Sequence, residues 1–196
     1  MALTVPESAV AGAVADVTGD GGAVRAVVLV EGRSDGAALS AAAHVLGRDL
    51  AAEHVAVVPM GGITNLLRFA DAAASVAPGV PTAALCDGGE ERWLARASLR
   101  MPVRPHVALC EQDLEDELLR ALGDRRALAV LEARGELSAF RVFQGQPAQR
   151  HRPATAQLHR FLGVASGRKT RMAGPLTAAL GADELPPPFL ALLAAV

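Results

Sequence analysis

Acidic side chains stand where apolar runs of the sequence end. Glu31 closes the run Val-Leu-Val, Asp35 comes four residues later, and Asp87 follows another apolar run. In an open parallel sheet, functional groups gather outside the carboxyl ends of the strands. We therefore expect these carboxylates to share one edge of a sheet. Mg²⁺ takes oxygen ligands and keeps several waters, so two or three acids suffice to hold it. The pattern predicts a site for a divalent cation.

Charge is distributed unevenly along the chain. Residues 31–117 carry thirteen acidic residues against seven arginines, whereas residues 141–196 carry six arginines and Lys169 against two acids. No acid lies between 141 and 182. An acidic cluster can hold divalent cations and a basic stretch can hold phosphates, so the asymmetry is compatible with nucleic-acid chemistry. The alternative is that arginine is simply abundant in this sequence.

Strand and helix patterns alternate over the part of the chain that carries these acids. Apolar runs predict strands at 23–30, 54–59, 81–86 and 103–109. Helical patterns separate them at 35–46, 64–76 and 90–99. A crossover between parallel strands needs a dozen or so residues and usually contains a helix. The alternation predicts an α/β fold with a Rossmann-like, mostly parallel four-stranded sheet flanked by helices. From residue 113 onward the pattern is helical, with pieces at 113–122 and 125–134 followed by an Arg- and Gln-rich connection at 141–153.

Length and composition predict one domain with an appendage. The chain has 196 residues, of which 51% are hydrophobic and 20% charged, as suits a folded core. We expect an N-terminal tail or loosely attached helix at 1–22, a core at 23–123, and a helical extension at 124–196 packed on the core. Cys86 and Cys110 are expected to be buried, reduced thiols. With no signal-peptide pattern and no long apolar run, we expect a cytoplasmic protein that does not enter membranes.

The order of these motifs resembles a known family. Val-Leu-Val-Glu31-Gly32-x-x-Asp35, followed by Asp87 after a third strand, resembles the Toprim domain shared by topoisomerases, bacterial primases and the overcoming-lysogenization-defect (OLD) nucleases. The resemblance to OLD-like proteins goes further, since they have a Gly-Gly turn after strand two and an acidic Leu-Glu helix after strand four. Here these are Gly61-Gly62 and Asp113-Leu114-Glu115. The resemblance spans roughly residues 24–175.

The resemblance implies roles for particular residues. One or two Mg²⁺ (or Mn²⁺) ions would be held by Glu31, Asp35, Asp87 and Glu115, and would activate a water and neutralise charge on a phosphodiester. Lys169, the only lysine in the chain, would act beside the catalytic Glu31 by stabilising the pentavalent phosphate. Turns would be made by Gly32, Gly61 and Gly62.

The chain departs from the Toprim pattern after the third strand. The usual Asp-x-Asp is here Asp87-Gly88-Gly89, so the second aspartate is absent. Glu90 or Glu91 could supply the carboxylate from one or two residues further on, with the glycines giving slack. The sequence therefore leaves open the possibility that the site binds only one metal ion or has weak activity. The ATPase half of full-length OLD nucleases has no counterpart here, so energy coupling would require a separate ATPase subunit.

Three functions remain open from the sequence. The first is a metal-dependent nuclease that cleaves nucleic acid; DNA is favoured over RNA as its substrate, but the sequence does not decide between them. The second is a catalytically lapsed Toprim module that binds nucleic acid, through Arg168 and Arg171, or an ATPase partner. The third is a receiver-like domain that accepts a phosphoryl group on Asp87.

Overall fold

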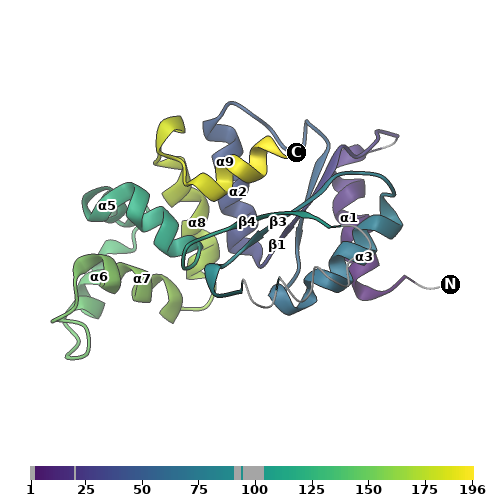
Figure 1. Cartoon of the computed structure of the whole chain (residues 1–196). Coiled ribbons are helices and arrows are strands. Elements are labelled where there is room, and N and C mark those ends of the chain that lie inside the picture. Colours follow the sequence, from purple (N-terminus) through teal and green to yellow (C-terminus); the bar gives the residue numbers. More distant parts are fainter. Residues whose placement is uncertain (1–2, 20, 91–93, 95–103) are drawn as a thin grey trace.

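Four parallel strands form the centre of the molecule (Figure 1). The structure is a computed structural model that describes residues 3–19, 21–90, 94 and 104–196. Within this part of the chain the strand order is β2-β1-β3-β4. The strands are β1 (Ala26–Val30), β2 (Val55–Pro59), β3 (Thr82–Cys86) and β4 (His106–Leu109). The predicted parallel α/β sheet is confirmed, and because all strands run the same way, their carboxyl ends share one edge.

The central strand β1 is buried along its whole length. Its five residues are Ala-Val-Val-Leu-Val, and Val28 pairs with Val57 on one side and with Ala83 on the other. A strand between two parallel neighbours and covered on both faces needs apolar side chains on both faces. The unbroken apolar run of the sequence reflects this position.

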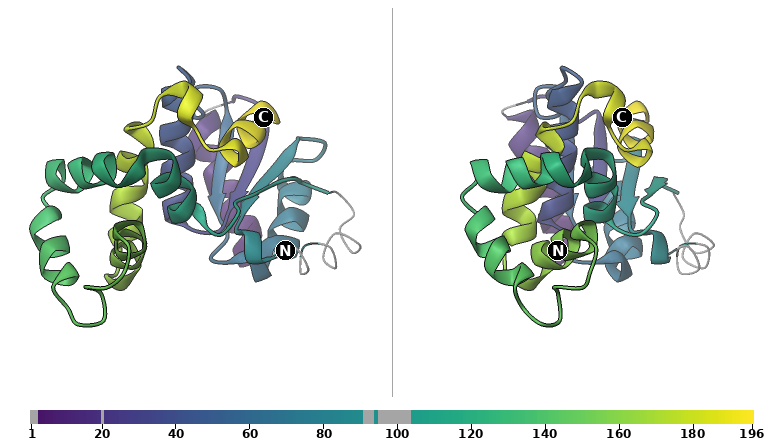
Figure 2. Two further views of the ribbon diagram at one scale, coloured as in Figure 1. Left: turned by 60° about the vertical axis from the view of Figure 1, so that its left-hand side comes forward. Right: turned by 90° about the vertical axis from the view of Figure 1, so that its left-hand side faces the viewer.

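Helices cover the two faces of the sheet with separate hydrophobic clusters. On one face Val27 and Leu29 pack against the helices α1 (Val5–Thr18) and α3 (Leu66–Val76). On the other face Val28 and Val30 join a cluster with α2 (Arg33–Val45), which lies along α8 (Arg168–Ala178). Figures 1 and 2 show the sheet sandwiched in this way.

The predicted helical extension follows β4. It consists of α5 (Leu114–Ala133), α6 (Leu137–Gln144), α7 (Ala154–Val164), α8 and α9 (Pro187–Ala194). The views in Figure 2 place α5, α6 and α7 to one side of the sheet, while α9 returns to pack on β3 and β4. Gly123 interrupts α5 with φ of 69° and ψ of 161°. The expected boundary at 123/124 falls at this kink, but the hydrophobic cluster continues across it.

Two segments differ from the sequence-based expectation. The expectation for residues 1–22 is loose attachment, yet α1 carries a capping box between Thr4 and Glu7 and buries Val10 completely against the sheet. The expectation for 141–153 is a connection, yet α6 extends into it because Phe140 and Phe143 pack on Phe161 of α7. The predicted helix at 90–99 lies largely outside the described residues.

Within the described residues, Cys86 and Cys110 are buried and unbridged, as expected. Burial is also the largest cause that raises the pKa of the Cys86 thiol, to about 12. No helix in the described part of the chain is both long and apolar enough to cross a membrane.

Gly88 lies where the backbones that leave β3 and β4 come together. A β-carbon at this position would stand 2.1 Å from the Glu111 carbonyl oxygen and 2.4 Å from the Cys110 carbonyl oxygen. The Gly88 amide donates to the Gln112 carbonyl at 3.0 Å, so the approach is held by a hydrogen bond. At Gly89 a β-carbon would meet no heavy atom of the described residues within 4 Å, and the backbone has no left-handed φ.

Gly88→Ala is therefore expected to destabilise the fold, by about 2–3 kcal/mol, because backbone oxygens cannot move aside for the methyl group. Gly89→Ala is the matched control and should change stability by no more than about 0.5 kcal/mol. The urea midpoint of unfolding, at constant slope, measures both effects. Equal midpoints for the two variants would contradict the close approach.

Candidate metal centre

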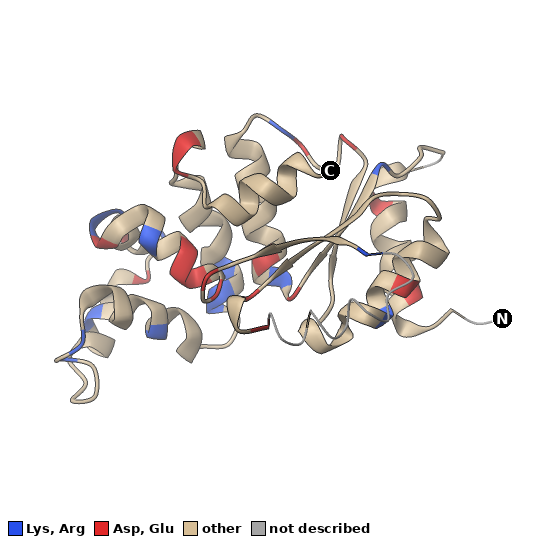
Figure 3. Cartoon of the chain, viewed as in Figure 1, with Lys and Arg blue, Asp and Glu red and all other residues tan. Residues whose placement is uncertain are grey.

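The acidic residues meet at the carboxyl edge of the sheet. Glu31 follows β1, Asp87 follows β3, and the segment 111–117 follows β4 and enters α5. Figure 3 shows acidic positions gathered where the strands end, with basic positions on the neighbouring helices. The predicted arrangement of carboxylates on one edge is what the parallel sheet produces.

Glu31 connects three strand exits. Its side-chain Oε1 accepts a hydrogen bond from the Asp87 amide at 2.9 Å, which joins the ends of β1 and β3. Its backbone carbonyl accepts from the amides of Gly61 and Gly62 at 2.9 and 3.1 Å, which joins the turn after β2. Gly61 and Gly62 have φ of 75° and 117°, values that favour glycine, so their expected role as turn residues fits their conformation. Their amides are bound to Glu31.

Asp35 faces the same edge from the first turn of α2. Its Oδ2 accepts from the Gly32 amide at 2.6 Å, which closes the start of the helix. Gly32 itself has φ of −140°, an extended conformation open to any residue, so its expected role as a sharp turn is not required by its backbone. Burial raises the pKa of Asp35 to about 6 and outweighs the Gly32 hydrogen bond, with further increases from the charges of Glu115 and Glu31.

Asp87 is surrounded by negative charge. Burial raises its pKa to about 7, and the charges of Glu31, Asp35, Asp113 and Glu115 act in the same direction. These couplings show that the carboxylates from β1, α2, β3 and α5 lie close enough to repel one another. A cation at this edge would stabilise the ionised form of Asp35 and Asp87, the two carboxylates whose pKa values are raised.

Lys169 reaches the edge from α8. Its Nζ donates to Oε2 of Glu115 at 2.7 Å, and the Glu115 side chain is only 6% exposed. Burial opposes the charge of Lys169, but the hydrogen bond to Glu115 and the charges of Glu115, Asp113 and Asp87 together raise its pKa. The structure thus brings together the sequence-predicted Lys169 and Glu115.

His159 is a neighbour of the site that the sequence pattern does not single out. Its Nε2 lies 2.8 Å from Oδ2 and 3.0 Å from Oδ1 of Asp113, the residue that caps α5. The two residues are 46 positions apart, and the five histidines show no ligand spacing, so no local pattern indicates the pair.

The arginines expected to bind nucleic acid occupy different environments. Arg168 is 11% exposed, pairs with Glu136 at 3.1 Å and stacks over the Phe161 ring at 3.7 Å. Arg171 also pairs with Glu136, at 3.2 Å, but is 59% exposed. Arg168 therefore ties α8 to α7 and to the start of α6, and its role in binding nucleic acid stays a prediction, as does that of Arg171.

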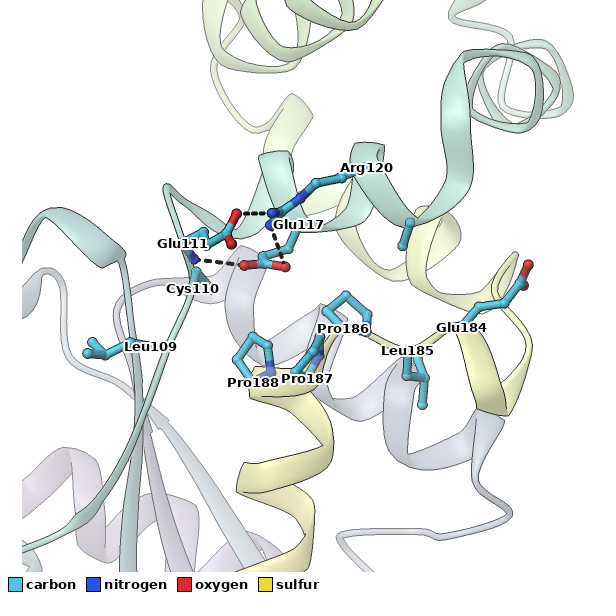
Figure 4. Close-up of a pocket in the computed structure, with 11 residues that line it drawn as sticks. Leu109, Cys110, Glu111, Glu117, Arg120, Glu184, Leu185, Pro186, Pro187 and Pro188 are labelled. Atoms are coloured by element: carbon cyan, nitrogen blue, oxygen red, sulfur yellow. Dashed lines mark hydrogen bonds and ion pairs between the residues drawn. The ribbon is translucent and has the colours of Figure 1, made fainter.

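A second acidic group beside β4 shares an arginine within the protein. Glu117 accepts from the Glu111 amide at 2.7 Å, and Arg120 forms ion pairs with Glu111, Glu117 and Asp116. Glu111, Glu117 and Arg120 line a cavity of about 500 Å³, whose opposite wall is the Pro186–Pro188 segment (Figure 4). Because each of these carboxylates is paired with Arg120, we do not include them in the candidate metal centre.

The carboxylate oxygens at the carboxyl edge of the sheet are suitable ligands for a hard divalent cation, although in the described part of the chain they do not make up a preformed coordination site. Among the described residues, no three His, Cys, Asp or Glu side chains form a group that could hold an ion together. Mg²⁺ is usually held by one or two carboxylates together with waters and substrate phosphates, so it does not need such a cage. The carboxylate oxygens and the raised pKa values of Asp35 and Asp87 fit this mode of binding. Glu90 ends the short 3₁₀ helix η2 (Gly88–Glu90), three residues after Asp87, and Glu91 lies outside the described residues.

Comparison with known families identifies the core. Residues 24–88, which include Glu31, Asp35 and Asp87, match the family model described as "Overcoming lysogenization defect protein-like, TOPRIM domain". The chain contains an OLD-like Toprim domain. The sequence-based resemblance is thereby confirmed. No curated protein matches the chain by sequence.

Solved structures share the fold of the Toprim domain and of the helices that follow it. The C-terminal region of the Burkholderia pseudomallei OLD protein matches with a TM-score of 0.64 at 18% identity, covering 87% of this chain and 96% of that one. The C-terminal region of the Xanthomonas campestris pv. campestris OLD protein matches with a TM-score of 0.62 at 22% identity, covering 88% and 94%. At these identities the likeness establishes the fold.

The stability of the metal-free Toprim domain should depend on Asp87 in a defined direction. Its pKa is raised from the ordinary value of 3.8 to about 7, so between these pH values the folded state binds more protons than the unfolded chain. Its contribution to stability therefore falls as pH rises through this window. Between pH 5 and pH 8, wild type should lose on the order of 1–2 kcal/mol more than Asp87→Asn, allowing for screening by water.

Urea unfolding in the presence of a chelator measures this difference. Asp71→Asn, at an exposed position on α3, is the control and should follow wild type. Added Mg²⁺ should reduce the loss in wild type, because a bound cation favours the ionised carboxylates. An Asp87→Asn variant with the same pH profile as wild type would contradict the crowding of charge at this edge.

Proposed function

We propose that this Toprim domain is a metal-dependent nuclease that cleaves phosphodiester bonds of nucleic acid, DNA rather than RNA. The observation that carries the proposal is the convergence of Glu31, Asp35, Asp87 and Glu115 at one sheet edge, with raised pKa values at Asp35 and Asp87. Bound Mg²⁺ or Mn²⁺ would supply an activated water and charge neutralisation at the phosphate. The Toprim match favours this function over a receiver-like phosphoacceptor.

Glu31, Asp35 and Asp87 are the proposed ligands. Glu31 is fixed by the Asp87 amide on one oxygen, and among the described residues no hydrogen bond occupies its other oxygen, which could bind a cation. Asp35 is similarly oriented by the Gly32 amide. Ligands held by backbone hydrogen bonds lose little freedom when they bind, and this supports binding through only a few direct carboxylates.

Lys169 and Glu115 form the proposed phosphate-facing part of the site. The lysine ammonium is a compact charge of the kind that stabilises negative charge developing on a phosphate. Its hydrogen bond to the buried Glu115 keeps it at the edge and keeps it protonated. A substrate phosphate would then meet a fixed positive charge opposite the carboxylates.

A second candidate is a Toprim module that binds nucleic acid or a separate ATPase subunit without cutting. The absent second aspartate at Gly89 favours it, because one fewer carboxylate weakens the hold on a second metal ion. This candidate shares the fold and the edge with the first and differs in turnover. Cleavage assays separate the two.

Glu31→Gln is expected to reduce metal-dependent nicking of supercoiled plasmid by at least about a hundredfold, because it removes a ligand charge from the reacting centre. Glutamine keeps a side-chain oxygen that can accept from the Asp87 amide, so the fold should persist. Gel assays with Mg²⁺ and with Mn²⁺ measure the rate. Glu132→Gln, at an exposed position on α5, is the matched control and should cut like wild type.

If the Glu31→Gln variant still cleaves plasmid at the wild-type rate, the assignment of a nuclease site to this edge is wrong. Wild-type protein that binds plasmid but does not cut it with either metal would favour the second candidate.

Gly89→Asp should restore the missing carboxylate and tighten Mn²⁺ binding by about tenfold, or add a second bound ion, because another oxygen ligand joins the edge. No described residue occupies the space where a β-carbon would stand at position 89, and the backbone has no left-handed φ, so the described part of the chain accommodates an aspartate. Gly89→Asn is the matched control, since it has the same shape without the charge. Isothermal calorimetry measures affinity and stoichiometry. Equal Mn²⁺ binding by the two variants would mean that position 89 does not face the metal, and would favour Glu90 as the replacement ligand.

A further inference from the structure

A separate cavity lies beside the acidic edge, between the start of α5 and the start of α7. It has a volume of about 410 Å³. On one wall lie Gln112 and Asp116, which flank the capping residue Asp113. On the other lie Arg152, His159 and Arg160. The acid-free basic segment of the sequence meets the acidic edge here.

The positive charges of this cavity are available to a ligand. Arg152 and Arg160 are exposed, and among the described residues neither has a carboxylate within ion-pair distance. The Arg152 side chain donates a hydrogen bond from Nε to the Ala148 carbonyl at 3.1 Å, which leaves the rest of its guanidinium group to a ligand. Asp116 lies 3.6 Å from Arg120, which also pairs with Glu111 and Glu117, so the negative charge of Asp116 still counts toward the cavity. The lining of the cavity thus holds two guanidinium groups and one carboxylate, that of Asp116.

His159 connects the cavity with the candidate metal centre. It lines the cavity and also bonds Asp113, whose charge acts on Asp87. A ligand in the cavity would therefore lie next to the carboxylate edge. The first turn of α7 also lines the cavity, and its N-terminal amides add partial positive charge on the same side.

We propose that Arg152, His159 and Arg160 bind a backbone phosphate of the nucleic-acid strand that flanks the scissile bond. Guanidinium groups match phosphate oxygens in a fork geometry and read no base, so this contact would position the strand without selecting a sequence. The inference rests on the proposed function, because it names where the substrate of that site is held. It assigns strand binding to α7 and the loop before it, whereas the sequence points to Arg168 and Arg171 on α8.

The test measures binding without turnover. A fluorescein-labelled oligonucleotide, single-stranded or duplex, is titrated with Glu31→Gln protein in Mg²⁺ and followed by anisotropy at several salt concentrations. Adding Arg152→Ala and Arg160→Ala should weaken binding about tenfold and reduce the magnitude of the salt slope by about 0.7 for a single strand or 0.9 for a duplex. The loss of affinity should be the same for oligonucleotides of unrelated base sequence.

Two further variants make the result specific. Arg25→Ala with Arg104→Ala removes the same charge from exposed positions that precede β1 and β4, at the opposite edge of the sheet, and should change affinity less than twofold. Arg152→Lys with Arg160→Lys keeps the charge and should restore most of the salt slope but only part of the affinity. Circular dichroism checks the fold of each variant.

The outcomes separate this inference from the nuclease proposal. If the Arg152 and Arg160 alanine variant binds as tightly as the Arg25 and Arg104 control, or if the parental protein binds neither oligonucleotide, the phosphate subsite is wrong. If the two arginines are required for binding while wild-type protein fails to cut plasmid, the phosphate contact is supported and the proposed nuclease activity is rejected.

Discussion

The hydrogen bond from the Asp87 amide to the Glu31 carboxylate joins the two central strands at their exits, and the rest of the site depends on it. The same residue holds the Gly61-Gly62 turn through its backbone carbonyl. Glu31 follows a strand that is buried on every residue and paired on both sides, so its backbone has little room to shift. A single glutamate thus sets the relative positions of the loops after β1, β2 and β3, which any ligand at the edge would meet.

The carboxylates at the carboxyl edge of the sheet have different charged partners from those of the neighbouring acidic cluster around Glu117. At Glu117, burial and the charge of Asp116 also raise the pKa, but here Arg120 contacts the carboxylate at 2.8 Å, and the Glu117 side chain ties α5 to the loop after β4. At Asp35 and Asp87, burial and like charges raise the pKa values, and Lys169 is paired with Glu115 rather than with either aspartate. Such an arrangement costs stability in the absence of a cation. Functional sites are where folds tolerate a cost of this kind, since the ligand relieves it.

Much of this architecture can be predicted from the sequence, because strand ends are local signals. Buried parallel strands read as apolar runs, and their carboxyl ends must share an edge, so the sequence alone places Glu31, Asp35 and Asp87 together. The pairs Lys169–Glu115 and His159–Asp113 span 54 and 46 residues and depend on how α7 and α8 dock on α5. No spacing in the sequence encodes that docking. Arg168 illustrates the same limit, because charge alone does not distinguish an arginine that faces solvent from one that packs on a carboxylate and an aromatic ring.

The fold restricts the two positions after Asp87, Gly88 and Gly89, to different degrees, and this difference bears on the missing second aspartate. Gly88 is required by the fold, because the Glu111 and Cys110 carbonyl oxygens occupy the space where a side chain would begin. Gly89 meets no such obstacle among the described residues, and its backbone has no left-handed φ that would favour glycine. Packing therefore explains the first glycine and leaves the second unconstrained. It follows that the scaffold is compatible with either glycine or aspartate at position 89. The number of carboxylates at this edge can therefore change without any change in the sheet that positions them.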